Sequence, residues 1–221
     1  GAGAGPDAPA PHQPVRIPPC GGADQLQRTC PPPPRKKPNG NPMNYCSHCG
    51  AKITTVIPPG DDRPRHFCTA CGTIHYENPK MVVGCIPEWQ DRVLLCRRAI
   101  QPRHGKWTLP AGYLENGERV AEGAKRELFE EACARSVAVV PYALYDLTFV
   151  NQMYLFFRAP LAGAEFAAGK ESLDVRLFDE EQIPWGELAF QVVSETLKRY
   201  FEDRRAGTFT FHTGQIRRPT F

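Results

Sequence analysis

Three glutamates gather on one edge of a segment that has the pattern of a helix. Residues 112–134 read GYLENGERVAEGAKRELFEEACA, in which Asn116 is a start signal and small apolar residues recur at helical spacings. Glu127, Glu130 and Glu131 are spaced by three and four, so a helix would bring their side chains together beside its buried face. Like charges at these spacings repel each other, and the cluster therefore favours a positive partner.

A divalent cation is one partner that would neutralise this cluster. Carboxylate oxygens are hard ligands that suit Mg²⁺ or Mn²⁺, and Mg²⁺ commonly shares them with waters and with the phosphates of a substrate. The alternative is an acidic helix face exposed to water, in which Lys125 and Arg126 offset part of the charge. The charges of the helix by themselves leave both interpretations open.

The residues that frame the cluster decide between these interpretations. One motif consists of a glycine, a glutamate after five intervening residues, and an arginine with three glutamates after seven more: Gly112, Glu118, Arg126, Glu127, Glu130 and Glu131. This motif resembles the Nudix box, the signature of hydrolases that act on nucleoside diphosphates linked to another group. Cys133 stands where the family usually has a glycine that ends the helix in a left-handed conformation.

The resemblance implies a reaction in which Mg²⁺ or Mn²⁺ bridges a diphosphate and orients an attacking water. The implied metal ligands are three carboxylates and one carbonyl, those of Glu127, Glu130, Glu131 and Gly112. Arg126 would hold the carboxylates in place, and Glu118 would give similar support. Gly112 and Glu118 also count among the residues expected at the substrate.

Two further roles need residues outside the box. Family members take their general base either from this helix or from a glutamate on a later loop, and Glu171 is the first candidate, with Glu165 behind it. An ordinary polar loop residue is the alternative interpretation of Glu171. Arg97 and Arg98 lie on the approach to the box and are candidates to bind diphosphate oxygens through charge-assisted hydrogen bonds.

Two CxxC pairs precede the box and predict a structural zinc site. Cys46 and Cys49 form one pair, and Cys68 and Cys71 form the other after an interval of 18 residues. Two such turns complete a tetrahedral thiolate site of the kind that holds Zn²⁺, which stabilises a fold and leaves no position for catalysis. A redox CxxC needs one pair only, and two disulfides need an oxidising compartment. A subset of Nudix hydrolases carries a similar ribbon ahead of its catalytic domain.

The remaining cysteines indicate a reducing compartment. Cys20 and Cys30 fall in the first 42 residues, whereas Cys85, Cys96 and Cys133 have apolar neighbours and are interpreted as small core residues. The count of nine is odd and the chain shows no secretion signal, so a cytoplasmic location fits best. The sequence contains no run of 18 apolar residues, so it predicts no membrane span.

Composition divides the chain into four parts. Residues 1–42 hold 12 of the 23 prolines and few large apolar residues, which predicts a disordered tail, either native or a remnant of expression. Residues 43–77 are assigned to the ribbon, 78–205 to the Nudix domain and 206–221 to a C-terminal arm or added strand. The formal charge of +3 comes from the tail, so the folded part is neutral and gives no argument for nucleic-acid binding.

Alternating and β-branched runs predict strands at 81–86, 93–96, 136–150, 152–159 and 173–178, with Asn151 in a turn. Apolar residues spaced by three and four predict a second amphipathic helix over 185–204. The expected fold is therefore α/β, a Nudix-type α/β/α sandwich with a mixed sheet behind a small four-cysteine zinc ribbon.

The box fixes diphosphate chemistry but leaves the substrate to residues outside it. The ribbon, the linker and the stretch SLDVRLFDEEQIPW resemble one group of the family and imply ADP-ribose or FAD as substrate, with Tyr113, Phe149 and Tyr154 as candidates to stack a base. A pyrophosphatase for NADH or a nucleotide sugar is one alternative. Another is a nucleotide-sensing or nucleic-acid-binding regulator that uses the ribbon. The resemblance also implies a homodimer.

Overall fold

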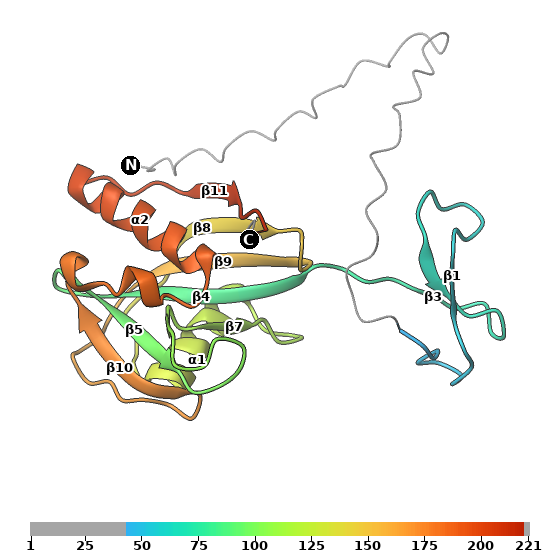
Figure 1. The fold of residues 1–221 in the computed structure, drawn as a ribbon, viewed down its shortest axis with the longest axis horizontal. Helices are drawn as coiled ribbons and strands as arrows, with labels where there is room; N and C mark the ends of the chain where they lie inside the picture. Colours follow the sequence, from blue (N-terminus) through green and yellow to red (C-terminus); the bar gives the residue numbers. More distant parts are fainter. Residues whose placement is uncertain (1–42, 219–221) are drawn as a thin grey trace, which may run out of the picture. The chain divides into compact units, whose positions relative to one another are not determined.

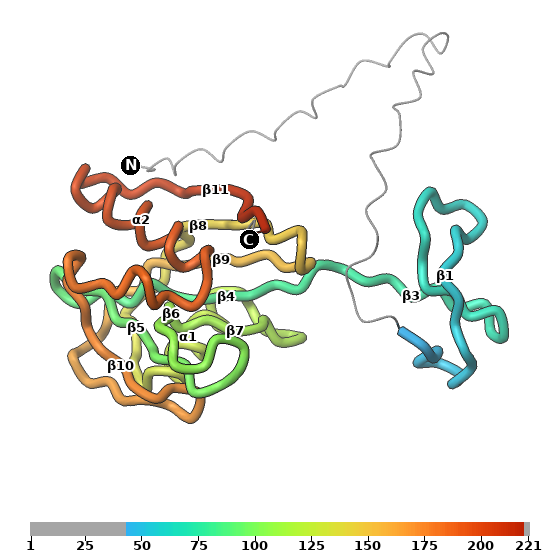
Figure 2. Tube along the Cα trace, in the orientation of Figure 1, coloured from blue at the N-terminus to red at the C-terminus, as the bar shows by residue number. Residues whose placement is uncertain are grey.

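The computed structural model of the 221-residue chain describes residues 43–218. The predicted disordered tail, residues 1–42, lies outside the described residues together with Cys20 and Cys30. Within the described range the chain forms a small ribbon and a larger α/β module, which Figure 1 draws as ribbons and Figure 2 as a continuous trace. No helix between residues 43 and 218 is long and apolar enough to cross a membrane.

The small module is an antiparallel sheet of three short strands in sequence order. Its strands are β1 (Thr54–Val56), β2 (Arg65–Phe67) and β3 (Ile74–His75). Tight turns hold the cysteines: Gly50 has a φ of 73° and donates its amide to the carbonyl of Cys46 at 2.9 Å. Gly72 has a φ of 75° and does the same to Cys68 at 2.8 Å. Both turns need the left-handed backbone that glycine adopts without strain.

The larger module is built on a mixed sheet of eight strands. The main path runs in the order β10-β5-β4-β9-β8-β11, while β6 pairs with β5 and β7 pairs with β4. Pairing is parallel between β4 and β9 and between β8 and β11, and antiparallel elsewhere. The strands are β4 (Lys80–Trp89), β5 (Arg92–Arg98), β6 (Trp107–Thr108), β7 (Ala111–Tyr113), β8 (Val140–Leu147), β9 (Gln152–Pro160), β10 (Ser172–Phe178) and β11 (His212–Gln215).

Two helices cover opposite faces of this sheet (Figure 1). They are α1 (Val120–Ala132) and α2 (Gln191–Ala206), and two short 3-10 turns, η1 (Glu180–Gln182) and η2 (Trp185–Glu187), lead into α2. Ala124, Leu128 and Ala132 of α1 pack on one core, and Val193, Leu197 and other residues of α2 pack on a second core across the sheet. This arrangement confirms the predicted α/β/α sandwich with a mixed sheet.

Both helices begin later than the sequence pattern predicted. Helix α1 begins at Val120, because residues up to Glu118 form a turn and the Glu122 carboxylate accepts the amide of Arg119 at 3.3 Å. The prediction that a helix begins at Trp185 is wrong, since α2 begins at Gln191. The preceding backbone makes an isolated bridge from Leu188 to Trp107 in β6, and a stretch that pairs with a strand is not free to start a helix.

The segment after α2 returns to the sheet as β11. Of the two alternatives left open for it, an arm or an added strand, it forms the strand. Strand β11 lies at the edge of the sheet beside β8. Asp203 of α2 ties it down, because its Oδ2 pairs with His212 Nε2 at 2.7 Å and accepts hydrogen bonds from the Tyr142 hydroxyl at 3.1 Å and the Thr210 amide at 3.2 Å. The chain beyond α2 is therefore part of the larger module.

Candidate active site

Strand β7 meets α1 at a glycine. Gly112 pairs with Val83 of β4, and an added Cβ at Gly112 would stand 2.3–2.4 Å from the carboxylate atoms of Glu127. Any larger residue would push the carboxylate away from the strand. Glycine at this position therefore allows the backbone of β7 to lie against the acidic edge of α1.

Arg126 binds three carboxylates at once. Its Nε and Nη2 donate to the two oxygens of Glu118 at 2.8 and 3.0 Å, and its Nη1 donates to Glu127 at 2.7 Å and to Glu130 at 2.9 Å. The carbonyl of Tyr113 accepts a further bond from Nη2 at 3.1 Å. The hydrogen bond from Arg126 is the main reason that the pKa of Glu118 is lowered, and the same bond raises the pKa of Arg126. The arginine therefore orients the acidic residues around it.

Glu131 is the most deeply buried member of the cluster. It is 5% exposed, and its Oε2 has no hydrogen-bond partner among the described residues. Burial, followed by the negative charge of Glu127, raises the pKa of Glu131 to about 8, against the opposing charge of Arg98. Burial also raises the pKa of Glu127, against the hydrogen bond from Arg126. Two neighbouring carboxylates out of water are costly when both are ionised.

These residues fit a hard divalent cation by their chemistry. A cation would give the unpartnered oxygen of Glu131 a ligand bond and would offset the two buried charges. The glutamates are less tightly gathered than the cysteines, which are the one group of three or more such side chains in the described residues that is placed to hold a metal ion. Arg126 instead occupies an oxygen of Glu127 and an oxygen of Glu130. The site is thus acidic and rich in oxygen atoms, and the guanidinium group of Arg126 holds its carboxylates.

The two candidates for the general base lie in different surroundings. Glu171 borders the same cleft as Glu127, Glu130 and Glu131. Burial and nearer groups have larger effects, but the negative charge of Glu171 also raises the pKa of both Glu127 and Glu131. Glu171 therefore lies within electrostatic reach of both. Glu165 is exposed and is not among the residues that line the cleft.

The two candidate arginines are neighbours in β5, and their side chains point to opposite faces of the sheet. Arg98 lines the cleft, donates from Nε to the carbonyl of Pro102 at 2.9 Å, and stacks 5.2 Å from the ring centre of Phe190. Arg97 is exposed, donates to the carbonyl of Gly105 at 2.9 Å, and is not among the lining residues. Successive residues of a strand point to opposite faces, which explains why only one of the two faces the glutamates.

A cleft of about 1280 Å³ extends from the box toward α2 and the C-terminal segment. Its floor near α1 is acidic, while its other end is lined by aromatic and aliphatic residues. All three predicted stacking candidates, Tyr113, Phe149 and Tyr154, line it. Phe190 and Arg218 also line it, and sequence reasoning missed both because they come from the start of α2 and from the segment after β11.

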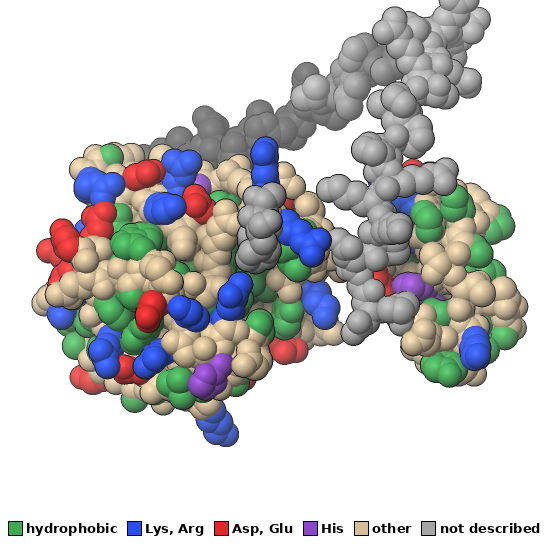
Figure 3. Space-filling view, in the orientation of Figure 1, with side chains coloured by type: hydrophobic (Ala, Val, Ile, Leu, Met, Phe, Trp, Pro, Cys, Tyr) green, Lys and Arg blue, Asp and Glu red, His purple; other side chains and the backbone are tan. Residues whose placement is uncertain are grey.

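On the face of the larger module drawn in Figure 3, basic and acidic side chains are interspersed. Neither sign forms a continuous patch there, in keeping with the balance of charges beyond residue 42.

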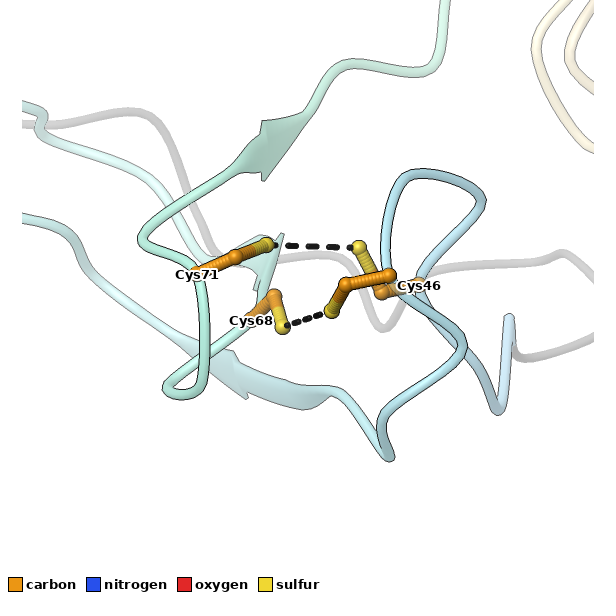
Figure 4. A group of neighbouring side chains, drawn as sticks. Cys46, Cys68 and Cys71 are labelled. Carbon is orange, nitrogen blue, oxygen red and sulfur yellow. Dashed lines mark hydrogen bonds between the residues drawn. The ribbon is translucent and has the colours of Figure 1, made fainter.

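The four ribbon cysteines form a compact sulfur cluster. Figure 4 shows side chains from the two turns pointing toward one another, and the four sulfurs all lie within 4.8 Å of each other. The distance from Cys46 Sγ to Cys71 Sγ is 3.7 Å, and from Cys49 Sγ to Cys68 Sγ it is 3.5 Å. A tetrahedral ion with Zn–S bonds of about 2.3 Å would space its sulfurs about 3.8 Å apart, so the donor set fits zinc.

Of the three cysteines predicted to lie in the core, two do so. Cys85 and Cys96 are buried, but Cys133 is exposed and borders the cleft, so the prediction of a core position for Cys133 is wrong. Cys133 ends α1 with a φ of 49° and donates its amide to the carbonyl of Phe129 at 2.8 Å. It takes the left-handed conformation of the glycine that it replaces, which turns its side chain away from the apolar stripe.

Profiles of known families match both modules. The NUDIX domain profile matches residues 78–199, and the zinc-ribbon profile described as Nudix N-terminal matches residues 44–77. A crystal structure of a NUDIX hydrolase from Nitrosomonas europaea is similar to this chain with a TM-score of 0.77 and 52% identity, over 80% of this chain and 100% of that one.

Curated relatives match over a smaller part of their length. The NAD-capped RNA hydrolase NudC of Stutzerimonas stutzeri is 30% identical over 145 residues, which are 63% of this chain and 49% of the relative. The ADP-ribose pyrophosphatase of Methanocaldococcus jannaschii is 29% identical over 119 residues, 52% of this chain and 69% of the relative. The chain thus spans about half the length of the first of these relatives.

Proposed function

Because the chain belongs to the Nudix hydrolase family, we propose that it hydrolyses the pyrophosphate bond of a nucleoside diphosphate linked to another group, with ADP-ribose or FAD as its substrate. The observation that carries this proposal is that the glutamates anchored by Arg126 open into a cleft of about 1280 Å³. Ligand pockets are commonly about 300–1,000 Å³, so this cleft has room for two groups joined by a diphosphate.

The acidic edge of α1 supplies the metal site in this proposal. When bound there, Mg²⁺ or Mn²⁺ would offset the charge of the diphosphate and orient the attacking water. Arg126 keeps the carboxylates at the floor of the cleft, and Glu118 holds Arg126 by two hydrogen bonds. The proposed ligands are the carboxylates of Glu127, Glu130 and Glu131 and the carbonyl of Gly112.

Glu171 and Arg98 act on the substrate from outside the box. Water adds across the P–O–P bridge: its oxygen bonds to one phosphorus, and the bond from that phosphorus to the bridging oxygen breaks. Glu171 accepts the proton that the water loses. Arg98, held beside Phe190, donates to the diphosphate oxygens, and Arg97 is left out of this role because it does not line the cleft.

The apolar end of the cleft suits the two nonreacting groups. Phe149, Tyr154 and Phe190 line this end, and aromatic rings of this kind can stack an adenine or a flavin. A nucleoside triphosphate carries one base only and would leave part of this wall uncovered. The aromatic end therefore favours a substrate with two ring systems or with a base and a sugar.

A second candidate is hydrolysis of the pyrophosphate of NADH or of an NAD-capped RNA. It is favoured by one observation, the ribbon and NUDIX profiles in one chain together with matches to proteins named as NAD-capped RNA hydrolases. The chemistry at the box is the same. The two candidates differ only in what occupies the wall of the cleft opposite the adenosine.

A hydrolysis panel separates these candidates. ADP-ribose, FAD, NADH, a nucleotide sugar and an NAD-capped RNA are each supplied with Mg²⁺ or Mn²⁺, and products are identified by mass spectrometry. Glu130→Gln and Glu131→Gln serve as blanks. We expect AMP and ribose 5-phosphate from ADP-ribose, or AMP and FMN from FAD, at rates well above the other substrates.

Faster turnover of NADH or of the capped RNA would transfer the proposal to the second candidate. Tight binding of a nucleotide with no turnover of any substrate would instead indicate a nucleotide-sensing regulator. Equal rates in the wild type and in both glutamine variants would mean that the box does not carry the reaction.

A further inference from the structure

The loop between β9 and β10 is fastened to the C-terminal end of α1. The amide of Ala167 donates to the carbonyl of Ala132 at 2.9 Å, and the amide of Gly169 donates to the carbonyl of Glu131 at 3.0 Å. The last carbonyls of a helix have no partner within the helix, so these two amides complete the helix end. The loop thereby adds to the bond that Cys133 makes at the same end.

Gly169 is the point of closest approach between loop and helix. An added Cβ at Gly169 would stand 1.7 Å from the carbonyl oxygen of Glu130 and 3.2 Å from the carbonyl carbon of Glu131. These are backbone atoms of a helix, which cannot swing aside as the end of a side chain can. In contrast, an added Cβ at Gly186 would meet nothing within 4 Å. The loop therefore rests on the turn of α1 that carries two of the proposed metal ligands.

Glu171 follows this contact by two residues and is fixed from the other side as well. The amide of Ser172 donates to the carbonyl of Gly169 at 3.1 Å, and the carbonyl of Glu171 accepts the amide of Ala99 at 2.8 Å. The backbone of Glu171 is thus held between α1 and the end of β5. Its side chain borders the cleft with Glu127, Glu130 and Glu131.

We propose that Gly169 is a positioning residue that sets the distance between Glu171 and the glutamates of α1. The inference rests on the proposed function, because it concerns where the proton acceptor of that reaction lies. A shift of about 1 Å in a reacting group can cost on the order of 10²-fold in rate. Gly169 can cause such a shift, because it lies against the backbone of α1 and its carbonyl accepts the amide of Ser172, the residue after Glu171.

The first test replaces Gly169 by alanine. We expect Gly169→Ala to lower kcat by about 10- to 100-fold with KM changed by less than about threefold, since substrate contacts lie elsewhere in the cleft. Gly186→Ala is a matched control with open space for the methyl group. Gly163→Ala is a control in the same loop, where the nearest atoms to the methyl group would belong to the flexible carboxylate of Glu165. Both controls should keep the wild-type kcat, and a Gly169→Ala variant that also keeps it would overturn the inference.

A double-mutant cycle distinguishes positioning from general damage. Glu171→Gln removes the proton acceptor, which is worth about 10²- to 10⁴-fold in kcat. If Gly169 acts through Glu171, adding Gly169→Ala to Glu171→Gln should change kcat by less than about twofold. If instead Gly169→Ala lowers kcat by the same factor in the Glu171→Gln background as in the wild type, Gly169 acts on the metal ligands. That outcome would contradict the inference.

A third variant keeps the inference testable if Gly169→Ala does not fold, as judged by its melting curve. Glu171→Asp leaves the loop intact and draws the carboxylate back by one methylene, so a placed acceptor should lose about 10-fold or more in kcat. Wild-type kcat in Glu171→Asp would overturn the inference. If the wild type turns over the panel and Glu171→Gln is equally active, the inference fails while the proposed function stands. If the wild type turns over no substrate, both fail.

Discussion

The ribbon and the acidic edge of α1 both gather side chains whose chemistry suits a metal ion, yet the two clusters are built differently. In the ribbon, four sulfurs from two short turns already lie within 4.8 Å of one another, and each turn is closed by a hydrogen bond between residues four apart. In α1, an arginine holds the carboxylates, and one buried oxygen of Glu131 lacks a partner among the described residues. The rest of that site comes from β5, β7 and the loop before β10.

The two sites therefore affect stability in different ways. A ribbon site that is complete by itself contributes folding energy when its ion binds, and it has no position left for a substrate. The α1 site keeps a buried carboxylate oxygen without a hydrogen-bond partner among the described residues, which costs stability, and it depends on residues far apart in the sequence. Sites of the second kind are suited to a reaction.

The largest effect is expected from removing zinc from the ribbon. We expect a strong chelator, or Cys68→Ser, to unfold residues 43–77 while the larger module keeps its own melting transition. Structural Zn²⁺ contributes on the order of 10 kcal/mol to small modules, more than the ribbon's three short strands can replace. Amide NMR spectra and melting curves measure both modules. Cys85→Ala, in the core of the larger module, is the control that should keep the zinc content, and a single shared transition would contradict the independence of the modules.

The next effect concerns the cost of the buried carboxylate. The pKa of Glu131 in the folded protein is raised to about 8, so its ionised form is penalised by folding. That penalty is fully present above pH 8 and fades as the pH falls from 8 toward the ordinary carboxyl value. Metal-free protein should therefore gain a few kcal/mol of unfolding free energy between about pH 9 and about pH 6.

Urea unfolding at several pH values measures this gain. Glu131→Gln should flatten the dependence, whereas Glu130→Gln, at an exposed neighbour, should leave it in place. An unchanged slope in Glu131→Gln would show that the buried carboxylate is not its source. Added Mg²⁺ should stabilise the wild type most at high pH, where Glu131 is ionised.

The cleft offers a smaller test of whether distant elements complete the α1 site. Arg98→Ala should raise KM by about 10- to 100-fold, because a hydrogen bond to a charged group contributes about 1.5–3 kcal/mol. Arg97→Ala, one residue away but outside the cleft, should change KM by about twofold or less. Steady-state kinetics on the best substrate of the panel measures both. Equal effects of the two variants would show that diffuse positive charge, rather than a placed arginine, binds the diphosphate.

The smallest expected effect is at the end of α1. Cys133 has a φ of 49°, and a left-handed conformation costs a residue with a Cβ about 1 kcal/mol or more. Cys133→Gly should therefore raise the unfolding free energy by about 1 kcal/mol, a gain of a few degrees in melting temperature. Cys133→Ala removes the thiol but keeps the strain, so it should bring no such gain. A stabilised alanine variant would assign the effect to the sulfur instead.

Features with a local cause could be predicted from the sequence. The CxxC turns are set by spacing and by the glycines that follow them, and the acidic edge of α1 is set by helical periodicity. The later start of α2 could not be predicted, because the bridge from Leu188 to Trp107 joins residues 81 positions apart. The exposure of Cys133 also escaped prediction, since its left-handed backbone turns the side chain out of the stripe.

The candidate site divides in the same way. The box residues were identified from their own order, whereas the choice between Arg97 and Arg98 depends on which face of β5 meets α1. The contact of Gly169 with α1 depends on how a loop lands on a helix about forty residues earlier. The assignments of the general base and of the metal ligands stay predictions that the variants above can decide.

The segment that follows the edge strand β11 is a place where such an enzyme can change its substrate preference. Ile216 and Arg218, which follow it, form part of the cleft wall, yet the hydrogen bonds of Arg126 to the glutamates of the box involve neither of them. Substitutions in this last segment can remodel the pocket for a new leaving group while the hydrolytic apparatus is inherited unchanged. Descendants of this chain that keep its chemistry but hydrolyse other molecules would be expected to diverge here first.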